Sequence, residues 1–255
     1  MVPATAMTRN PAAPRPPFWL SAARWIASGA NSLLHVVPLL VVSPFSRRLG
    51  WAVYRHWGRT MCRIFGIVPV LRDDNVGPVS GACLYIWLNQ TSLAEVPAFA
   101  ALLPPWYTIA NVEYAIMPLF GWAMVPLRNI VIVRQWKWQA KRGIERAAAR
   151  LAQGERWLVS IEGARSADGE LQPYKKGPIV MALRSQATIV PLAVRGAREI
   201  MPKGDWRLRP GRIEVHLLEA IPTRGLTYDD RDVVLERLQR AAERAMTGEV
   251  KWRRA

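Results

Sequence analysis

Leu88-Asn89-Gln90-Thr91-Ser92-Leu93-Ala94-Glu95 is the stretch that decides the fold of this chain. It follows an apolar run, residues 83–88, that predicts a buried β-strand. Ser92 and Glu95 have the Ser-x-x-Glu spacing of a capping box, which predicts a helix beginning at Ser92. The polar cluster should therefore lie at a strand-to-helix turn, where α/β sheets usually bind their ligands.

Downstream of Leu71, short β-branched or aromatic runs alternate with helical stretches, which predicts successive β and α units. The expected strands are residues 83–88, 106–110, 129–134, 156–161, 188–194 and 212–218. The expected helices are residues 92–103, 136–153, 178–185 and 229–246. We therefore expect an α/β fold.

Composition restricts the classes of protein to which the chain can belong. Its 255 residues suffice for one large α/β domain with an appendage. A net charge of +16 calls for an anionic partner, which can be nucleic acid, a lipid surface or an acidic substrate. The chain is also 51% hydrophobic with 12 Trp, a combination typical of membrane-surface proteins. It carries no nucleic-acid-binding motif, so nucleic acid is not an expected partner.

Cysteine and histidine give no indication of a metal centre. Cys62 and Cys83 provide neither a disulfide framework nor a metal-binding cluster. His35, His56 and His216 lie far apart in the sequence. We therefore expect neither a metal ion nor a bound cofactor.

The N-terminal quarter divides into three segments. Residues 1–17 are rich in Pro and Ala and are predicted to be disordered. Residues 18–42 are apolar and long enough to cross a bilayer, although internal polar residues and Pro38 leave open whether they span it or lie in it. We expect residues 18–68 to form a membrane-anchoring helical pair and residues 69–255 to form the α/β domain.

The second helix of that pair, residues 46–65, is amphipathic and basic. Its two faces carry four arginines on one side and four apolar residues on the other, namely Arg48, Arg55, Arg59 and Arg63 against Val53, Trp57, Met61 and Ile64. The apolar face can pack on a protein core or lie in lipid. We favour a pair that lies in one leaflet, because the apolar segment directly precedes this helix.

The opening stretch resembles the first motif of the glycerolipid (lysophosphatidate-type) acyltransferases, which is Asn-His followed by four residues and Asp. Gln90 stands at the His position and Glu95 at the Asp position. Five further stretches resemble segments of the same family in the same order: residues 110–121, 129–134, 160–166, 174–177 and 190–192. Asn111, Val133, Ile161 and Ala164 depart from the family pattern. The resemblance implies an α/β fold with a mixed sheet flanked by helices.

The resemblance also implies a site and a reaction. In the family, the His takes a proton from an acceptor hydroxyl that attacks the thioester of acyl-CoA or acyl carrier protein, and the Asp orients the His. The implied catalytic positions are Gln90 and Glu95. The implied substrate-binding positions are Asn89, Ser92, Arg134, Glu162, Gly163, Arg165, Ser166 and Lys175.

Arg134 and Arg165 each follow an expected strand, and a guanidinium group can bind a phosphate through two hydrogen bonds. These arginines, with Lys175, are therefore candidates for a phosphate-binding cradle. An ion pair between Arg165 and Glu162 is the alternative. Gly163 allows a close backbone approach or an unusual φ angle.

Gln90 determines which function the resemblance supports. A neutral amide is both donor and acceptor but has no basic nitrogen near pH 7. Glu95 can act as the base itself, or it can merely cap the helix while Gln90 bonds within the turn. Two hypotheses follow: a membrane-associated O-acyltransferase of phospholipid synthesis at the cytoplasmic face of the inner membrane, or a pseudoenzyme that binds lysophospholipid or acyl donor there.

Overall fold

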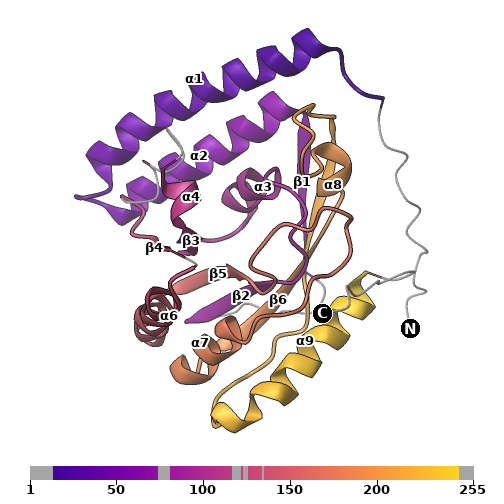
Figure 1. The fold of residues 1–255 in the computed structure, drawn as a ribbon. Helices are drawn as coiled ribbons and strands as arrows, with labels where there is room; N and C mark the ends of the chain where they lie inside the picture. Colours follow the sequence, from indigo (N-terminus) through magenta and orange to yellow (C-terminus); the bar gives the residue numbers. More distant parts are fainter. Residues whose placement is uncertain (1–13, 74–80, 117–121, 123–125, 134, 247–255) are drawn as a thin grey trace.

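The computed structural model describes residues 14–73, 81–116, 122, 126–133 and 135–246. Its centre is a five-stranded sheet with the strand order β1-β7-β6-β2-β5 (Figure 1). The strands are β1 (Ile67–Asp73), β2 (Cys83–Trp87), β5 (Arg156–Ser160), β6 (Thr188–Arg195) and β7 (Gly211–Leu217). Only β6 and β7 pair antiparallel, so the sheet is mixed and the predicted fold class is confirmed.

Alternation of side chains along β2 explains why helices cover both faces of the sheet. Cys83, Tyr85 and Trp87 belong to one buried cluster, with residues of α2 (Arg47–Phe65) and α3 (Glu95–Leu102). Leu84 and Ile86 belong to the other cluster, with residues of α6 (Lys137–Ala152), α7 (Gly177–Ser185) and α9 (Arg231–Ala245). Successive strand residues point to opposite faces, and every β2 residue is buried because each face has a helical layer.

A second, two-stranded parallel sheet joins β3 (Ile109–Asn111) to β4 (Ile130–Ile132). The short helix α4 (Val112–Ala115) follows β3. The predicted strands 106–110 and 129–134 were too long. Tyr107 instead makes an isolated bridge to Trp157 of the main sheet, and the backbone N–H of Thr108 donates to the Asn129 side chain at 3.0 Å.

Two short helical elements lie in the connections after β6 and before α9. The short helix α8 (Ala197–Ile200) follows β6, and a 3₁₀ turn, η1 (Tyr228–Asp230), precedes α9. The side chains and backbone N–H groups of Thr227 and Asp230 bond reciprocally as a capping box. This cap fixes where the 3₁₀ turn begins, and α9 follows directly after it.

The helical pair is α1 (Phe18–Val42) and α2, and α2 lies between α1 and α3 (Figure 1). Trp57 and Met61, on the apolar face of α2, are buried in the protein core. Gly58 permits this close packing, since a Cβ there would lie 2.7 Å from the Ala100 side chain. Our expectation that the apolar face of α2 lies in lipid was therefore wrong: that face packs on protein.

The outer helix α1 has an exposed apolar face, whereas the apolar face of α2 is covered by protein. Helix α1 runs unbroken through Pro38. Among the described helices, it is the one that is long enough and apolar enough to cross a membrane. Its inner stripe is buried, whereas Ile26 and Leu34 on the outer side are 75% and 72% exposed. Arg24 and Trp25 bond to the carbonyl oxygens of Leu208 and Trp206, which ties the start of α1 to the loop before β7.

Candidate active site

The turn that follows β2 is held by side chains that bond to backbone. The Asn89 amide donates to the Val194 carbonyl at 2.6 Å and accepts from the Val194 N–H at 2.8 Å. Asn89 is buried, and this pair of hydrogen bonds joins the end of β2 to the end of β6. The structure thus places Asn89 where it positions the turn beneath Gln90.

Glu95 closes the same turn from inside. It is wholly buried, and its Oε1 accepts hydrogen bonds from Thr91 N, Thr91 Oγ1 and Ser92 N at 3.1, 2.7 and 2.9 Å. The helix begins at Glu95 and not at Ser92 as predicted, because Ser92 Oγ donates to the Met201 carbonyl and accepts from Ala94 N. These bonds occupy the turn, so Glu95 is poorly placed to serve as the base itself.

Glu162 and Ser166, in the segment after β5, also bond to the turn. Glu162 Oε2 accepts from Gln90 N and Oε1 accepts from Gln172 N, both at 2.6 Å. Ser166 N donates to the Gln90 carbonyl at 2.8 Å. The two carboxylate oxygens of Glu162 are therefore used by backbone amides, and the alternative ion pair with Arg165 does not form. Gly163 has φ of +69°, the unusual conformation that the sequence predicted.

We expect Glu162→Ala to lower the free energy of unfolding by about 2–4 kcal/mol, because two part-buried N–H groups would lose charge-assisted acceptors. Denaturant unfolding of the purified chain measures this loss. Glu170→Ala, at a half-buried position in the same segment, is the control. Equal stabilities of the two variants would contradict the positioning role of Glu162.

Burial raises the pKa of Glu95 to about 8 and that of Glu162 to about 7, and the donors on each carboxylate oppose this rise. Folded Glu95 therefore holds its proton over a pH range in which the unfolded chain releases it. The Glu95 carboxyl makes its full contribution to the free energy of unfolding below the pKa of the unfolded chain, about 4.3. That contribution is lost as pH rises towards 8.

We expect the wild type to lose about 2–3 kcal/mol of stability relative to Glu95→Gln between about pH 6 and pH 8. The amide cannot ionise, yet its oxygen can still accept the three hydrogen bonds on Oε1. Unfolding curves of both chains over this pH range measure the difference. Parallel pH dependence would show that Glu95 does not titrate in the window.

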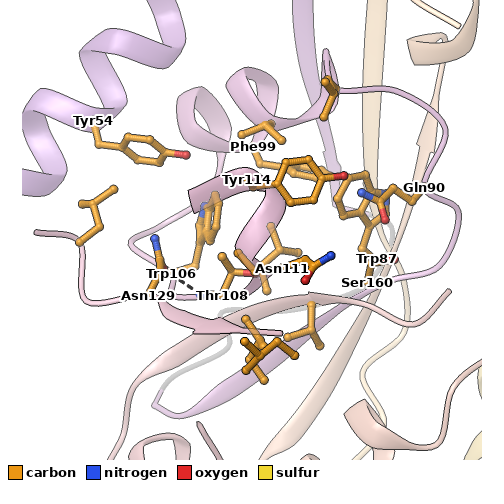
Figure 2. Close-up of a pocket in the computed structure, with 18 of the residues that line it drawn as sticks. Tyr54, Trp87, Gln90, Phe99, Trp106, Thr108, Asn111, Tyr114, Asn129 and Ser160 are labelled. Carbon is orange, nitrogen blue, oxygen red and sulfur yellow. Dashed lines mark hydrogen bonds between the residues drawn. The ribbon is translucent and has the colours of Figure 1, made fainter. Parts of the chain in front are cut away.

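A cavity of about 330 Å³ begins at this turn and extends to the helical pair (Figure 2). Gln90 lines it, but Glu95 does not. Most of the wall is apolar, and it comes from α1, α2 and α3, from strands of both sheets, and from α6 and α7. Representative lining residues are Val36, Leu39, Val53, Trp57, Trp87, Phe99, Ile132, Leu158 and Met181.

Polar groups gather near Gln90 at one end of the cavity. Gly163 and Lys175 of the predicted site line the cavity. Asn111, Tyr114 and Ser160 also line it, and Figure 2 shows them on the side of Gln90. The sequence motifs contained these last three residues but gave no reason to single them out as site residues. Arg165 is half-buried just beyond Gly163 and does not line the cavity, and its carbonyl accepts from Lys203 Nζ at 3.1 Å. Arg134 lies outside the described residues.

His35 is the one histidine among the described lining residues. Its Nδ1 lies 2.7 Å from the Asn31 carbonyl oxygen, and its Nε2 lies 2.8 Å from His56 Nδ1. Both ring nitrogens are thus already engaged between α1 and α2. His35 does not replace the basic nitrogen that Gln90 lacks. No cluster of metal-binding side chains occurs within the part of the chain that the structure describes.

Comparison with known proteins bears on the identity of this site. A sequence model of the Acyltransferase family matches residues 78–195, which include the turn, β5 and the Gly163 segment. A 1-acyl-sn-glycerol-3-phosphate acyltransferase of Chlamydomonas reinhardtii is 25% identical over 85% of this chain and 68% of its own length. A chloroplastic one of Brassica napus is 22% identical over 70% of this chain and 54% of its own length.

These matches support a relationship to the glycerolipid acyltransferase family. Its fold is that of the 1-acyl-sn-glycerophosphate acyltransferase PlsC of Thermotoga maritima, with a TM-score of 0.72 and 19% sequence identity over 91% of this chain and 97% of that one. This chain departs from the first motif of that family at two positions, with Gln90 in place of the His and Glu95 in place of the Asp.

Proposed function

We propose that this chain is a membrane-associated O-acyltransferase that moves a fatty acyl group from acyl-CoA or acyl carrier protein to a lysophospholipid such as lysophosphatidate. The observation that carries the proposal is the apolar cavity with a polar end at Gln90, Gly163 and Lys175. An apolar channel suits an acyl chain, and polar groups at one end suit a thioester and an acceptor hydroxyl. The relatives' names support the acceptor class.

The residues of the turn would act mainly by positioning. Glu162, Asn89 and Glu95 fix the backbone around Gln90 through the hydrogen bonds described above. The N–H groups of Thr91, Ser92 and Ala94 already bond within the turn, so the start of α3 offers no spare donor from these three residues. Side-chain donors such as Lys175 would therefore stabilise developing negative charge at the cavity's polar end.

The experiment that tests the proposal is transfer of radiolabelled acyl groups from acyl-CoA to lysophosphatidate by the full chain in lipid vesicles. Formation of phosphatidate above the uncatalysed rate supports it. Binding of lysophosphatidate and acyl-CoA without any transfer supports the second candidate, a binding protein that lacks catalysis. The presence of an amide at position 90 is the observation that favours this candidate.

We also propose that Arg165 binds the acceptor's phosphate. Arg165→Ala should weaken binding of a lysophosphatidate analogue by roughly 10- to 100-fold, the scale of one hydrogen bond between charged groups. Arg184→Ala is the matched control, because it removes the same charge from an exposed ion pair on α7. An equal, small effect of both variants on affinity would show that Arg165 does not contact the phosphate.

The location that we propose is the cytoplasmic face of the inner membrane, with the chain held by α1. The exposed apolar side of α1 and the chain's net charge of +16 both suit an anionic lipid surface. Arg48, Arg59 and Arg63 of α2 are exposed beside α1 and would face the lipid headgroups.

A further inference from the structure

The end of the cavity remote from Gln90 carries several polar side chains. Figure 2 places Tyr54, Trp106 and Asn129 at this end, and Gln90, Trp87 and Ser160 at the other. A simple hydrocarbon chain would leave each of these polar groups without a hydrogen bond from the ligand. Polar atoms in an apolar cavity are therefore informative about what the cavity binds.

Trp106 provides the strongest observation. It lines the cavity, is only 5% exposed, and its indole Nε1 has no hydrogen-bond partner among the residues that the structure describes. By contrast, the indole of Trp57, which also lines the cavity, donates to Ser32 Oγ at 3.1 Å. Buried donors are nearly always paired, so an unpaired one that borders a cavity indicates an acceptor supplied by a ligand.

Asn129 adds a second donor at the same end. Its Oδ1 accepts from the backbone N–H of Thr108 at 3.0 Å, and a backbone N–H can only donate. This bond fixes which way the amide is turned, so the NH₂ group points away from Thr108. Figure 2 shows the Asn129 nitrogen on the side of Trp106 and Tyr54.

Tyr54 completes the group from α2. Its ring packs edge-on against the Trp106 ring, with centroids 6.0 Å apart, and its hydroxyl can donate or accept. Burial raises the pKa of Tyr54 well above its ordinary value, so the hydroxyl stays neutral and keeps its proton. Two donor groups and one hydroxyl therefore border a space whose walls are mostly apolar.

We infer that the remote end of the cavity is a subsite for an oxygen atom on the acyl chain, a hydroxyl or keto group distant from the thioester. This inference rests on the proposed function, because it assumes that an acyl chain occupies the cavity. The oxygen accepts from the Trp106 indole and the Asn129 amide, and a hydroxyl's own proton is accepted by Tyr54. The preferred substrates are then oxygenated acyl chains.

The test is displacement of a fluorescent acyl-CoA from the purified full chain in nanodiscs. The competitors are acyl-CoAs of one length, either unsubstituted or hydroxylated near the thioester, at mid-chain or at the far end. We expect one of the two remote hydroxyl positions to raise affinity about five- to tenfold over the unsubstituted chain, the effect of one well-made hydrogen bond. Hydroxylation near the thioester should give no such gain.

Trp106→Phe should bring that affinity ratio close to one, and Tyr54→Phe should reduce it. Trp157→Phe is the matched control, because Trp157 also has an unpaired buried indole but does not line the cavity. Its ratio should equal that of the wild type. If Trp106→Phe does not fold, Tyr54→Phe against Trp157→Phe makes the same comparison.

Two failures are distinguishable. If unsubstituted acyl-CoA displaces the probe but no hydroxyl position improves affinity, or Trp106→Phe keeps the ratio, the oxygen subsite is wrong and the proposed function stands. Such a result would mean that bound water satisfies Trp106. If no acyl-CoA displaces the probe, the cavity does not hold acyl chains, and both proposals are overturned.

Discussion

Gln90→His is expected to raise acyl transfer at neutral pH by ~10²–10⁴-fold, the usual contribution of a general base. Position 90 lines the cavity, whereas its backbone is fixed by Glu162 and Ser166. The substitution thus places a titratable nitrogen on a turn that is already held in position. Glu95 Oε2 has no hydrogen-bond partner within the described structure, and in the ionised carboxylate it is the acceptor by which we expect a His to be oriented.

The gain should disappear as pH falls below the pKa of the new His, about 6.5 if unperturbed, because the protonated ring cannot accept a proton. Gln90→Asn is the control, since it changes the side chain without adding a base. Initial rates of phosphatidate formation from about pH 5 to pH 9 separate the three chains. The double variant Gln90→His with Glu95→Gln should lose part of the gain.

Two other results would change the interpretation. High wild-type turnover that Glu95→Gln abolishes would identify Glu95 as the base, contrary to its buried position. Absence of turnover in both the wild type and Gln90→His, with lysophosphatidate binding intact, would favour the binding protein without catalysis.

The triple substitution Ile26→Glu, Leu34→Glu and Val37→Glu is expected to weaken vesicle binding by roughly 10³-fold. These three side chains are more than half exposed on the outer side of α1. Each would lose at least ~1.5 kcal/mol of apolar burial, and each adds a negative charge facing anionic lipid. Sedimentation with phosphatidylglycerol vesicles measures the change.

Substitution is a cleaner test than deleting the helical pair. Deletion through Phe65 would remove Trp57, Met61 and other core residues of α2, and loss of the fold would be confused with loss of binding. Val233→Glu, at an apolar residue of α9 that is also more than half exposed, is the control. Undiminished sedimentation of the triple variant would show that α1 does not anchor the chain.

The sequence predicted the buried strands best, because their apolar runs are bounded by turns. It missed β1, where Pro69, Arg72 and Asp73 resemble a linker. The sheet order explains this failure: β1 is an edge strand, only Ile67 within it is fully buried, and edge strands tolerate Pro and charge. An edge strand needs little hydrophobic signal because one partner strand suffices to define it.

The site was predictable where its residues are contiguous and not where tertiary structure brings them together. The motifs located Gln90, Gly163 and Lys175, which the fold brings to one cavity. They could not show that Glu162 bonds inward to two backbone amides, because spacing says nothing of side-chain direction. Trp106 and Asn129 meet only because β3 and β4 pair, and neither has a local pattern that marks it.

The pairing of β1 with β7 has a consequence for how the chain is made. Ile67 pairs with Gly211, so the edge strand that follows α2 cannot join the sheet until nearly the whole chain has left the ribosome. Closing so long a loop is slow, and parallel pairing between distant segments slows it further. Until then α1 and α2 emerge with their apolar faces uncovered, and early contact with the bilayer would protect them from aggregation.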